Sequence, residues 1–166
     1  MKVLLSTFPF GKYDKSPLKL LEETGWDIIR NPFKRRLKPS DMSELTAGID
    51  GIIAGTEPYD YDLFERNKGN LKVIARVGIG FDSIDFNAAE KHKVQVTYTP
   101  DAPSQAVAEL TVAQILNLNR YITSSDRSIR NNAWNRMIGW LVCERKIGLL
   151  GLGRIAKLVV NLLKPF

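Results

Sequence analysis

Residues 71–85 read Leu-Lys-Val-Ile-Ala-Arg-Val-Gly-Ile-Gly-Phe-Asp-Ser-Ile-Asp, and they contain the main parts of one repeating unit. The apolar, β-branched run Val73–Ala75 predicts a strand, and the glycines at positions 78 and 80 predict a tight turn after it. Asp85–His92 then has a helical pattern. A strand that ends in a turn and leads into a helix is typical of proteins with a parallel sheet.

The same pattern of short apolar run and amphipathic stretch repeats on both sides of this unit. Further strands are predicted at Val3–Leu5, Asp27–Ile29, Gly51–Ala54 and Val94–Val96. Helices are predicted at Pro17–Thr24, from Ser40 onward and at Tyr61–Arg66. The sequence therefore predicts an α/β fold with a flavodoxin-like parallel sheet over about residues 1–100.

The pattern changes after residue 100. Pro103 opens a helix that is predicted to run to about Ser124, with apolar residues on more than one face and hence more than one packing partner. Lys146–Gly151 predicts a further strand, and Arg154–Leu163 predicts the helix that follows it. Residues 101–166 are thus expected to hold an inter-domain helix and the incomplete start of a second α/β domain.

The turn between that strand and that helix reads Gly151-Leu-Gly153-Arg154-Ile155-Ala156. The first glycine permits a tight turn, the second lets a pyrophosphate approach the backbone, and the small Ala156 lets helix and strand meet closely. A helix N-terminus also offers free N–H groups and partial positive charge to phosphate. Dinucleotide binding is favoured over a plain turn, although the acidic ribose-binding residue expected about 20 positions further on would lie beyond the sequence.

The turn after Val73–Ala75 suggests a second anion site. It lies at the carboxyl end of its strand, where open α/β sheets bind their ligands. Gly78 and Gly80 can turn successive N–H groups toward a carboxylate, and Arg76 would add positive charge. The other interpretation is a structural turn, with Asp82 or Ser83 capping the next helix.

Composition excludes several classes of protein. The chain has 166 residues, of which 44% are hydrophobic and 25% charged, which is ordinary for a globular protein and not for a fibre or a disordered tail. No apolar run approaches the roughly 20 residues of a membrane span. A single cysteine permits no internal disulfide and predicts a cytoplasmic setting.

The net charge of +6 comes partly from a basic cluster that precedes the predicted helix at Ser40. This cluster consists of Lys34, Arg35, Arg36 and Lys38. No aromatic residues are interleaved with it, so a solvated face or one side of a groove for an anionic ligand is favoured over a nucleic-acid surface.

Three segments follow one another at familiar spacings: residues 71–85, residues 99–109 (Thr-Pro-Asp-Ala-Pro-Ser-Gln-Ala-Val-Ala-Glu) and residues 146–156. On these motifs the chain resembles the N-terminal part of the D-isomer-specific 2-hydroxyacid dehydrogenases, most closely the phosphoglycerate dehydrogenase branch. The resemblance implies a flavodoxin-like substrate domain followed by the first strand and helix of a Rossmann domain. It also implies NAD-dependent hydride transfer to or from a small 2-hydroxy or 2-keto acid, in a chain truncated within its nucleotide domain.

The resemblance also assigns residues. It implies that the backbone of Ile79 and Gly80 binds the substrate carboxylate close to the nicotinamide, and that the other substrate-binding residues are Thr56, Arg76 and Asp101. The implied cofactor-binding residues are Ile79, Gly151, Gly153, Arg154 and Ile155. It further implies a homodimer through the helix over residues 103–124. The phosphoglycerate enzymes of the family often have an arginine where this chain has Gly55, which argues against a phosphorylated substrate.

The family's catalytic arginine and its histidine–carboxylate pair lie later in the family's sequence, so no catalytic residue is expected within this chain. His92 is the only histidine and is flanked by lysines, which predicts an exposed side chain with no acidic partner. Cys143 is expected to be a buried or loop thiol, and Asp60 and Asp62 to cap a helix, so no metal site is predicted. The isolated chain is therefore expected to be inactive. The alternatives are a non-enzymatic dimeric binding module and, more weakly, a receiver or flavin carrier of flavodoxin type.

Overall fold

The computed structural model describes all 166 residues as two compact units, Met1–Pro100 (unit 1) and Asp101–Phe166 (unit 2). Unit 1 contains a sheet of five parallel strands in the order β2-β1-β3-β4-β5. The strands are β1 (Lys2–Leu5), β2 (Asp27–Arg30), β3 (Gly51–Ala54), β4 (Val73–Arg76) and β5 (Gln95–Tyr98). Each overlaps a run of the sequence that predicts a strand, and the α/β fold class is confirmed.

The register of the sheet brings the ends of β1, β3 and β4 side by side. Leu5 lies opposite Ile53, and Ala54 lies opposite Arg76. Because all five strands are parallel, the loops that follow them emerge at one edge of the sheet, which we call the carboxyl edge.

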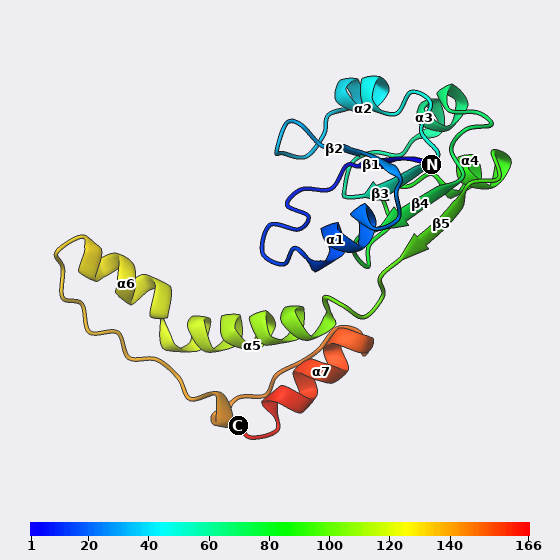
Figure 1. Ribbon diagram of the computed structural model, residues 1–166. Coiled ribbons are helices and arrows are strands. Elements are labelled where there is room, and N and C mark those ends of the chain that lie inside the picture. The colour runs from blue at the N-terminus through cyan, green and yellow to red at the C-terminus, as the bar shows by residue number, and fades with distance from the viewer. The chain divides into compact units, whose positions relative to one another are not determined.

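Four short helices connect the strands of unit 1 (Figure 1). They are α1 (Ser16–Glu22), α2 (Pro39–Leu45), α3 (Tyr61–Arg66) and α4 (Phe86–Lys91). Asp60 caps α3, as the sequence predicts, by accepting a hydrogen bond from the Leu63 amide. The predicted capping of α4 by Asp82 or Ser83 is wrong: the Asp85 carboxylate accepts from the Ala88 amide at 2.9 Å, because only Asp85 immediately precedes the first turn.

The hydrophobic core of unit 1 joins the middle of the sheet to α2, α3 and α4. Leu4, Ile52 and Ile74 lie on the three central strands and are fully enclosed, and Phe64 of α3 packs on the same cluster. Figure 1 shows α1 on the other side of the sheet from α2 and α3, and no residue of α1 is buried. The strands are thus held mainly from the side of α2, α3 and α4.

Unit 2 is helical. It contains α5 (Ser104–Arg120), α6 (Ile122–Arg130), a single 3-10 turn η1 (Val142–Glu144) and α7 (Arg154–Leu163), and α5 packs against α7. None of the helices in the structure is both long enough and apolar enough to cross a membrane.

Two sequence predictions fail in unit 2. The helix expected from Pro103 to Ser124 is interrupted at Tyr121, whose φ of 53° lies in the left-handed region and ends α5. The Asn117 side chain fixes the break, because its oxygen accepts hydrogen bonds from both the amide and the hydroxyl of Thr123. Lys146–Gly151 is not a strand, because no neighbouring strand is present to pair with it.

Candidate functional site

The glycine turn after β4 is wrapped around the side chain of Arg76. The Arg76 guanidinium donates to the Gly80 carbonyl oxygen at 3.0 Å and also to the Val77 carbonyl oxygen. The Gly78 amide donates to the Thr99 hydroxyl at 2.8 Å, and the Thr99 amide donates back to the Gly78 carbonyl oxygen. Gly78 has a φ of +143°, a backbone conformation that side chains rarely permit. The turn is therefore held by side chains from both ends.

Two successive amides in this turn have no hydrogen-bond acceptor. Neither the Ile79 nor the Gly80 N–H donates to any atom of the chain, and Gly80 is exposed. Arg76 forms no ion pair with Asp82 or any other acidic side chain, so its guanidinium and the two free N–H groups favour an anion at this turn. The turn can therefore accept a carboxylate.

The loop after β3 lies beside this turn at the carboxyl edge, because Ala54 and Arg76 are partners across the two strands. Thr56 is exposed in this loop, and its carbonyl oxygen accepts a hydrogen bond from the guanidinium of Arg36. The structure thus brings Thr56, Arg76, Ile79 and Gly80 to one edge of unit 1.

Glu57 is a residue of this edge whose burial sequence reasoning missed. It is only 1% exposed, and one carboxylate oxygen accepts from the Tyr59 hydroxyl at 2.9 Å and from the Ser6 hydroxyl at 3.3 Å. The Gly55 amide donates to the Tyr59 oxygen at 3.1 Å. Burial raises the pKa of Tyr59 far above its usual value, and the negative charge of Glu57 raises it further. Nothing in the sequence around Glu57 distinguishes it from a glutamate in an exposed loop.

The second glycine turn lies in unit 2, at the start of α7. Gly151 has a φ of +90°, and no atom lies within 4 Å of the position a Cβ would take at Gly151 or Gly153. Arg154 begins the helix, and its Nε lies 3.4 Å from a carboxylate oxygen of Asp101. Both side chains are largely exposed, so this ion pair is weak and leaves the arginine available to another anion.

The prediction of an exposed His92 without an acidic partner is wrong. Its side chain is 5% exposed, stacks on the Phe64 ring at a centroid distance of 6.3 Å, and places Nε2 3.4 Å from a Glu65 carboxylate oxygen. The faces of an imidazole ring are apolar, so the ring can be buried against an aromatic side chain even where its sequence neighbours are lysines. His92 follows the C-terminal end of α4, however, and helices of this fold run against the strands, so it lies at the opposite edge from the glycine turn.

Glu65 gives this cluster a measurable pH dependence. Hydrogen bonds from the Tyr61 hydroxyl and the Lys91 ammonium lower the pKa of Glu65 from 4.5 to about 2. The folded state therefore binds this proton less readily than the unfolded state, and the stabilisation is present above pH 4.5 and lost as the pH falls toward about 2. Glu65→Gln is expected to lower the free energy of unfolding at neutral pH, with the difference from wild type disappearing at about pH 2.

Urea unfolding of both proteins across this acid range measures the effect. Glu23→Gln is the matched control, because Glu23 has neither an ion pair nor a side-chain hydrogen bond. A Glu65→Gln difference that stays constant down to about pH 2 would contradict the assigned hydrogen bonds.

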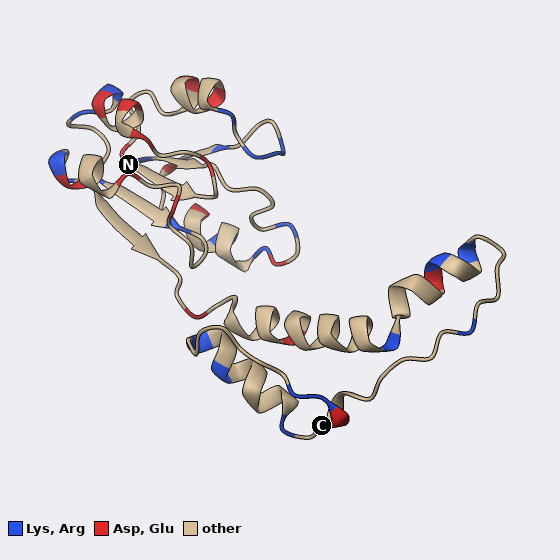
Figure 2. Cartoon of the chain, turned by 180° about the vertical axis from the view of Figure 1, so that it is seen from behind, with Lys and Arg blue, Asp and Glu red and all other residues tan.

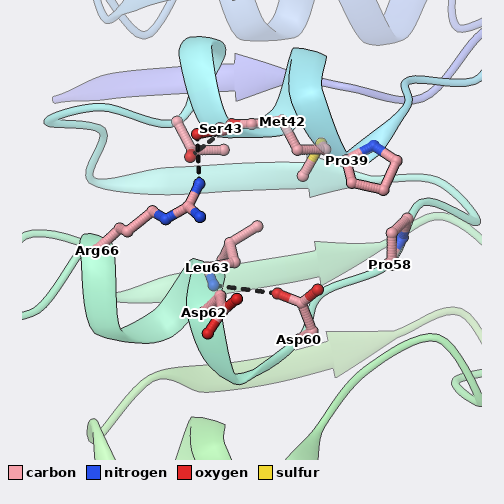
Figure 3. A pocket seen from close by; sticks show the side chains of 9 residues that line it. Pro39, Met42, Ser43, Pro58, Asp60, Asp62, Leu63 and Arg66 are labelled. Atoms are coloured by element: carbon pink, nitrogen blue, oxygen red, sulfur yellow. Dashed lines mark hydrogen bonds between the residues drawn. The ribbon is translucent and has the colours of Figure 1, made fainter.

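A small cavity of about 90 Å³ lies between α2 and α3 (Figure 3). Among its polar side chains, Arg66 donates to the Ser43 hydroxyl, and Asp60 accepts from the Leu63 amide. None of the residues of the β4 turn lines it. The cavity is thus part of the helix packing and not of the candidate site.

Other reactive side chains form no second site. Cys143 is exposed within η1 and has no histidine near it in the chain. No group of three His, Cys, Asp or Glu side chains is arranged to hold a metal ion.

The sequence profile of the D-isomer specific 2-hydroxyacid dehydrogenase catalytic domain matches residues 8–148. The chain belongs to this family. Among its relatives, a glyoxylate reductase of Thermofilum pendens is 33% identical over 87% of this chain and 42% of its own length. A D-3-phosphoglycerate dehydrogenase of Methanocaldococcus jannaschii is 31% identical over 90% of this chain and 28% of its own length.

Solved structures of other proteins have the same fold as this chain. An NAD-binding family member from Polaromonas superimposes with a TM-score of 0.84 at 24% identity, over 99% of this chain and 52% of that one. The NAD complex of a formate dehydrogenase from Staphylococcus aureus gives a TM-score of 0.78 at 26% identity, over 99% of this chain and 54% of that one. This chain therefore spans about half the length of these structures, and less than half of the two relatives.

Proposed function

We propose that the carboxyl edge of unit 1 binds the carboxylate of a small 2-hydroxy or 2-keto acid, as part of a NAD-dependent oxidoreductase. The observation that carries the proposal is the pair of unbonded amides at Ile79 and Gly80 next to the Arg76 guanidinium. A carboxylate has two oxygens, so each amide can donate to one of them while the guanidinium balances the charge. The exposed Thr56 lies beside the turn and would contact the rest of the acid.

We place the pyrophosphate of NAD at the start of α7. The open space at Gly151 and Gly153 fits a phosphate that approaches the backbone, and the first-turn amides of Arg154 and Ile155 would donate to it. The chemistry that NAD supplies when bound is acceptance of a hydride from C2 of the hydroxy acid. Asp101 remains a proposed neighbour of the substrate; within unit 2 it holds the Arg154 side chain.

The proton that leaves the hydroxyl group as C2 is oxidised requires a base. His92 is the only histidine, and it is enclosed at the opposite edge of the sheet. We therefore propose that the 166-residue chain alone does not oxidise 2-hydroxy acids, and that further chain supplies the catalytic arginine, carboxylate and histidine. We also propose a reducing, cytoplasmic setting, because the one cysteine of the chain, Cys143, can form no internal disulfide.

The test is to read the source DNA beyond the codon for Phe166 and to assay the chain itself. The expected reading frame continues into an acidic ribose-binding residue and then an arginine, a glutamate and a histidine, and the isolated chain oxidises no NADH with glyoxylate above a protein-free blank. A stop codon directly after Phe166 would contradict the enzyme and favour a non-enzymatic dimeric binding module. Turnover by the isolated chain would contradict the proposed absence of a base.

We also propose that α5 forms a homodimer. Apolar side chains protrude from it at Val107, Leu110 and Leu118, and only Glu109 and Arg120 are charged along its length (Figure 2). Positions 110 and 118 are eight residues apart and share one face. Leu118→Glu is expected to convert the dimer into a monomer, because the charge would be buried without a partner.

Light scattering of the purified proteins measures the change in mass. Leu20→Glu is the matched control, because Leu20 of α1 is 68% exposed and Leu118 is 72% exposed. A monomeric wild type, or a Leu20→Glu variant that dissociates equally, would contradict the dimer through α5.

A further inference from the structure

The basic loop between β2 and α2 is fixed against the carboxyl edge of unit 1. The Asn31 side-chain amide donates to the Ser6 carbonyl oxygen at 2.8 Å and to the Arg35 carbonyl oxygen at 2.7 Å. Leu37 is buried in the core, and the Arg36 guanidinium donates to the Thr56 carbonyl oxygen. The side chain of Arg36 is therefore held at the loop that follows β3.

Arg36 differs from its neighbour Arg35 in what it contacts. The Arg35 guanidinium pairs with the Asp41 carboxylate at 2.7 Å and stacks over the Phe33 ring. Arg36 forms no ion pair with an acidic side chain and is exposed. A guanidinium has five N–H donors, so the bond to Thr56 leaves most of them free for an anion.

The nearest acidic residue of the β3 loop does not neutralise Arg36, because it faces inward. The Glu57 carboxylate is buried on Ser6 and Tyr59. It also fills the space beside Gly55, where a Cβ would lie 2.5 Å from a Glu57 oxygen. A side chain at residue 55 would have to displace this carboxylate. With glycine at this position, the positive charge comes from the neighbouring loop.

The loop after β3 thus has a guanidinium on each side. Arg76 approaches from the neighbouring strand β4, and Arg36 approaches from the β2 side, since the strand order is β2-β1-β3-β4. We propose that Arg36 binds a second anionic group of the substrate, a carboxylate or a phosphate, while the turn at Arg76 binds the first. This inference rests on the proposed carboxylate site and names its substrate class: 2-hydroxy acids with a second anion.

Calorimetric titration of the 166-residue chain tests this with three probes: glycolate, which has one carboxylate, and D-malate and D-3-phosphoglycerate, which have a second anion. Wild type is expected to bind both larger probes at least about tenfold more tightly than glycolate. Arg36→Gln is expected to remove that preference and to leave glycolate binding unchanged. Arg36→Lys, which keeps the charge, is expected to retain part of it.

Lys38→Gln is the matched control, because it removes the same charge two residues away, from a side chain without an ion pair. A preference that survives Arg36→Gln, or that Lys38→Gln removes equally, would overturn the role of Arg36. If glycolate binds in a way that depends on Arg76, but the two larger probes bind no more tightly than glycolate, this inference alone is overturned. If none of the three probes binds, both this inference and the proposed carboxylate site are contradicted. Loss of preference for only one of the larger probes identifies the second anion as carboxylate or as phosphate.

Discussion

Gly78→Ala is expected to weaken glycolate binding to the chain at least about tenfold. At a φ of +143° an alanine is strained, at a cost of about 1–3 kcal/mol. The new Cβ would also lie 2.7 Å from Arg76 Nη1 and 3.0 Å from the Arg76 guanidinium carbon. The guanidinium must therefore leave the Val77 and Gly80 carbonyl oxygens, and the free amides lose the positive charge beside them.

Gly80→Ala provides the control in the same turn. The nearest atom to a Cβ at Gly80 is an Asp82 carboxylate oxygen at 3.8 Å, which is ordinary contact, and the substitution keeps the amide. Calorimetric titration with glycolate should therefore show near wild-type affinity for Gly80→Ala. Equal affinities for the Gly78→Ala variant and wild type would show that the turn does not bind the carboxylate.

Tyr59→Phe is expected to lower the free energy of unfolding of unit 1 by about 1–3 kcal/mol. The Tyr59 hydroxyl donates to the Glu57 carboxylate at 2.9 Å and accepts from the Gly55 amide at 3.1 Å, and all three groups are buried. Removing the hydroxyl leaves a buried carboxylate and a buried amide with fewer partners in a place that is enclosed from solvent.

Urea unfolding monitored by circular dichroism measures this difference. Tyr13→Phe removes the same atom from a side chain that is 87% exposed, so it should change the free energy of unfolding by less than about 0.5 kcal/mol. A Tyr59→Phe variant as stable as Tyr13→Phe would contradict the buried network and the fixed position of the β3 loop.

The elements of unit 1 could be predicted because their signals are local. The run Val73–Ala75 followed by glycines identifies a strand and its turn without knowledge of neighbours, and Asp60 caps the helix that it immediately precedes. The sequence also predicted that Thr56 and the β4 turn lie at the same edge, because the carboxyl ends of parallel strands meet at one edge of a sheet.

The predictions that were wrong concern residues whose structure depends on contacts with residues distant in the sequence. Lys146–Gly151 has the composition of a strand but no strand to pair with, and the burial of His92 depends on a ring of α3. The basic cluster appeared uniform in sequence, yet Arg35 is neutralised by Asp41 whereas Arg36 reaches a carbonyl oxygen of another loop. Only tertiary structure separates these two arginines.

The turn after β4 is proposed to bind the carboxylate of a 2-hydroxy acid. Titration of glycolate into the isotope-labelled chain, followed through the backbone amide resonances, measures this binding residue by residue. We expect the largest saturable shifts at the Ile79 and Gly80 amides, whose N–H groups are free in the structure. Saturable binding that leaves these two amides unchanged, or no binding at all, would contradict it.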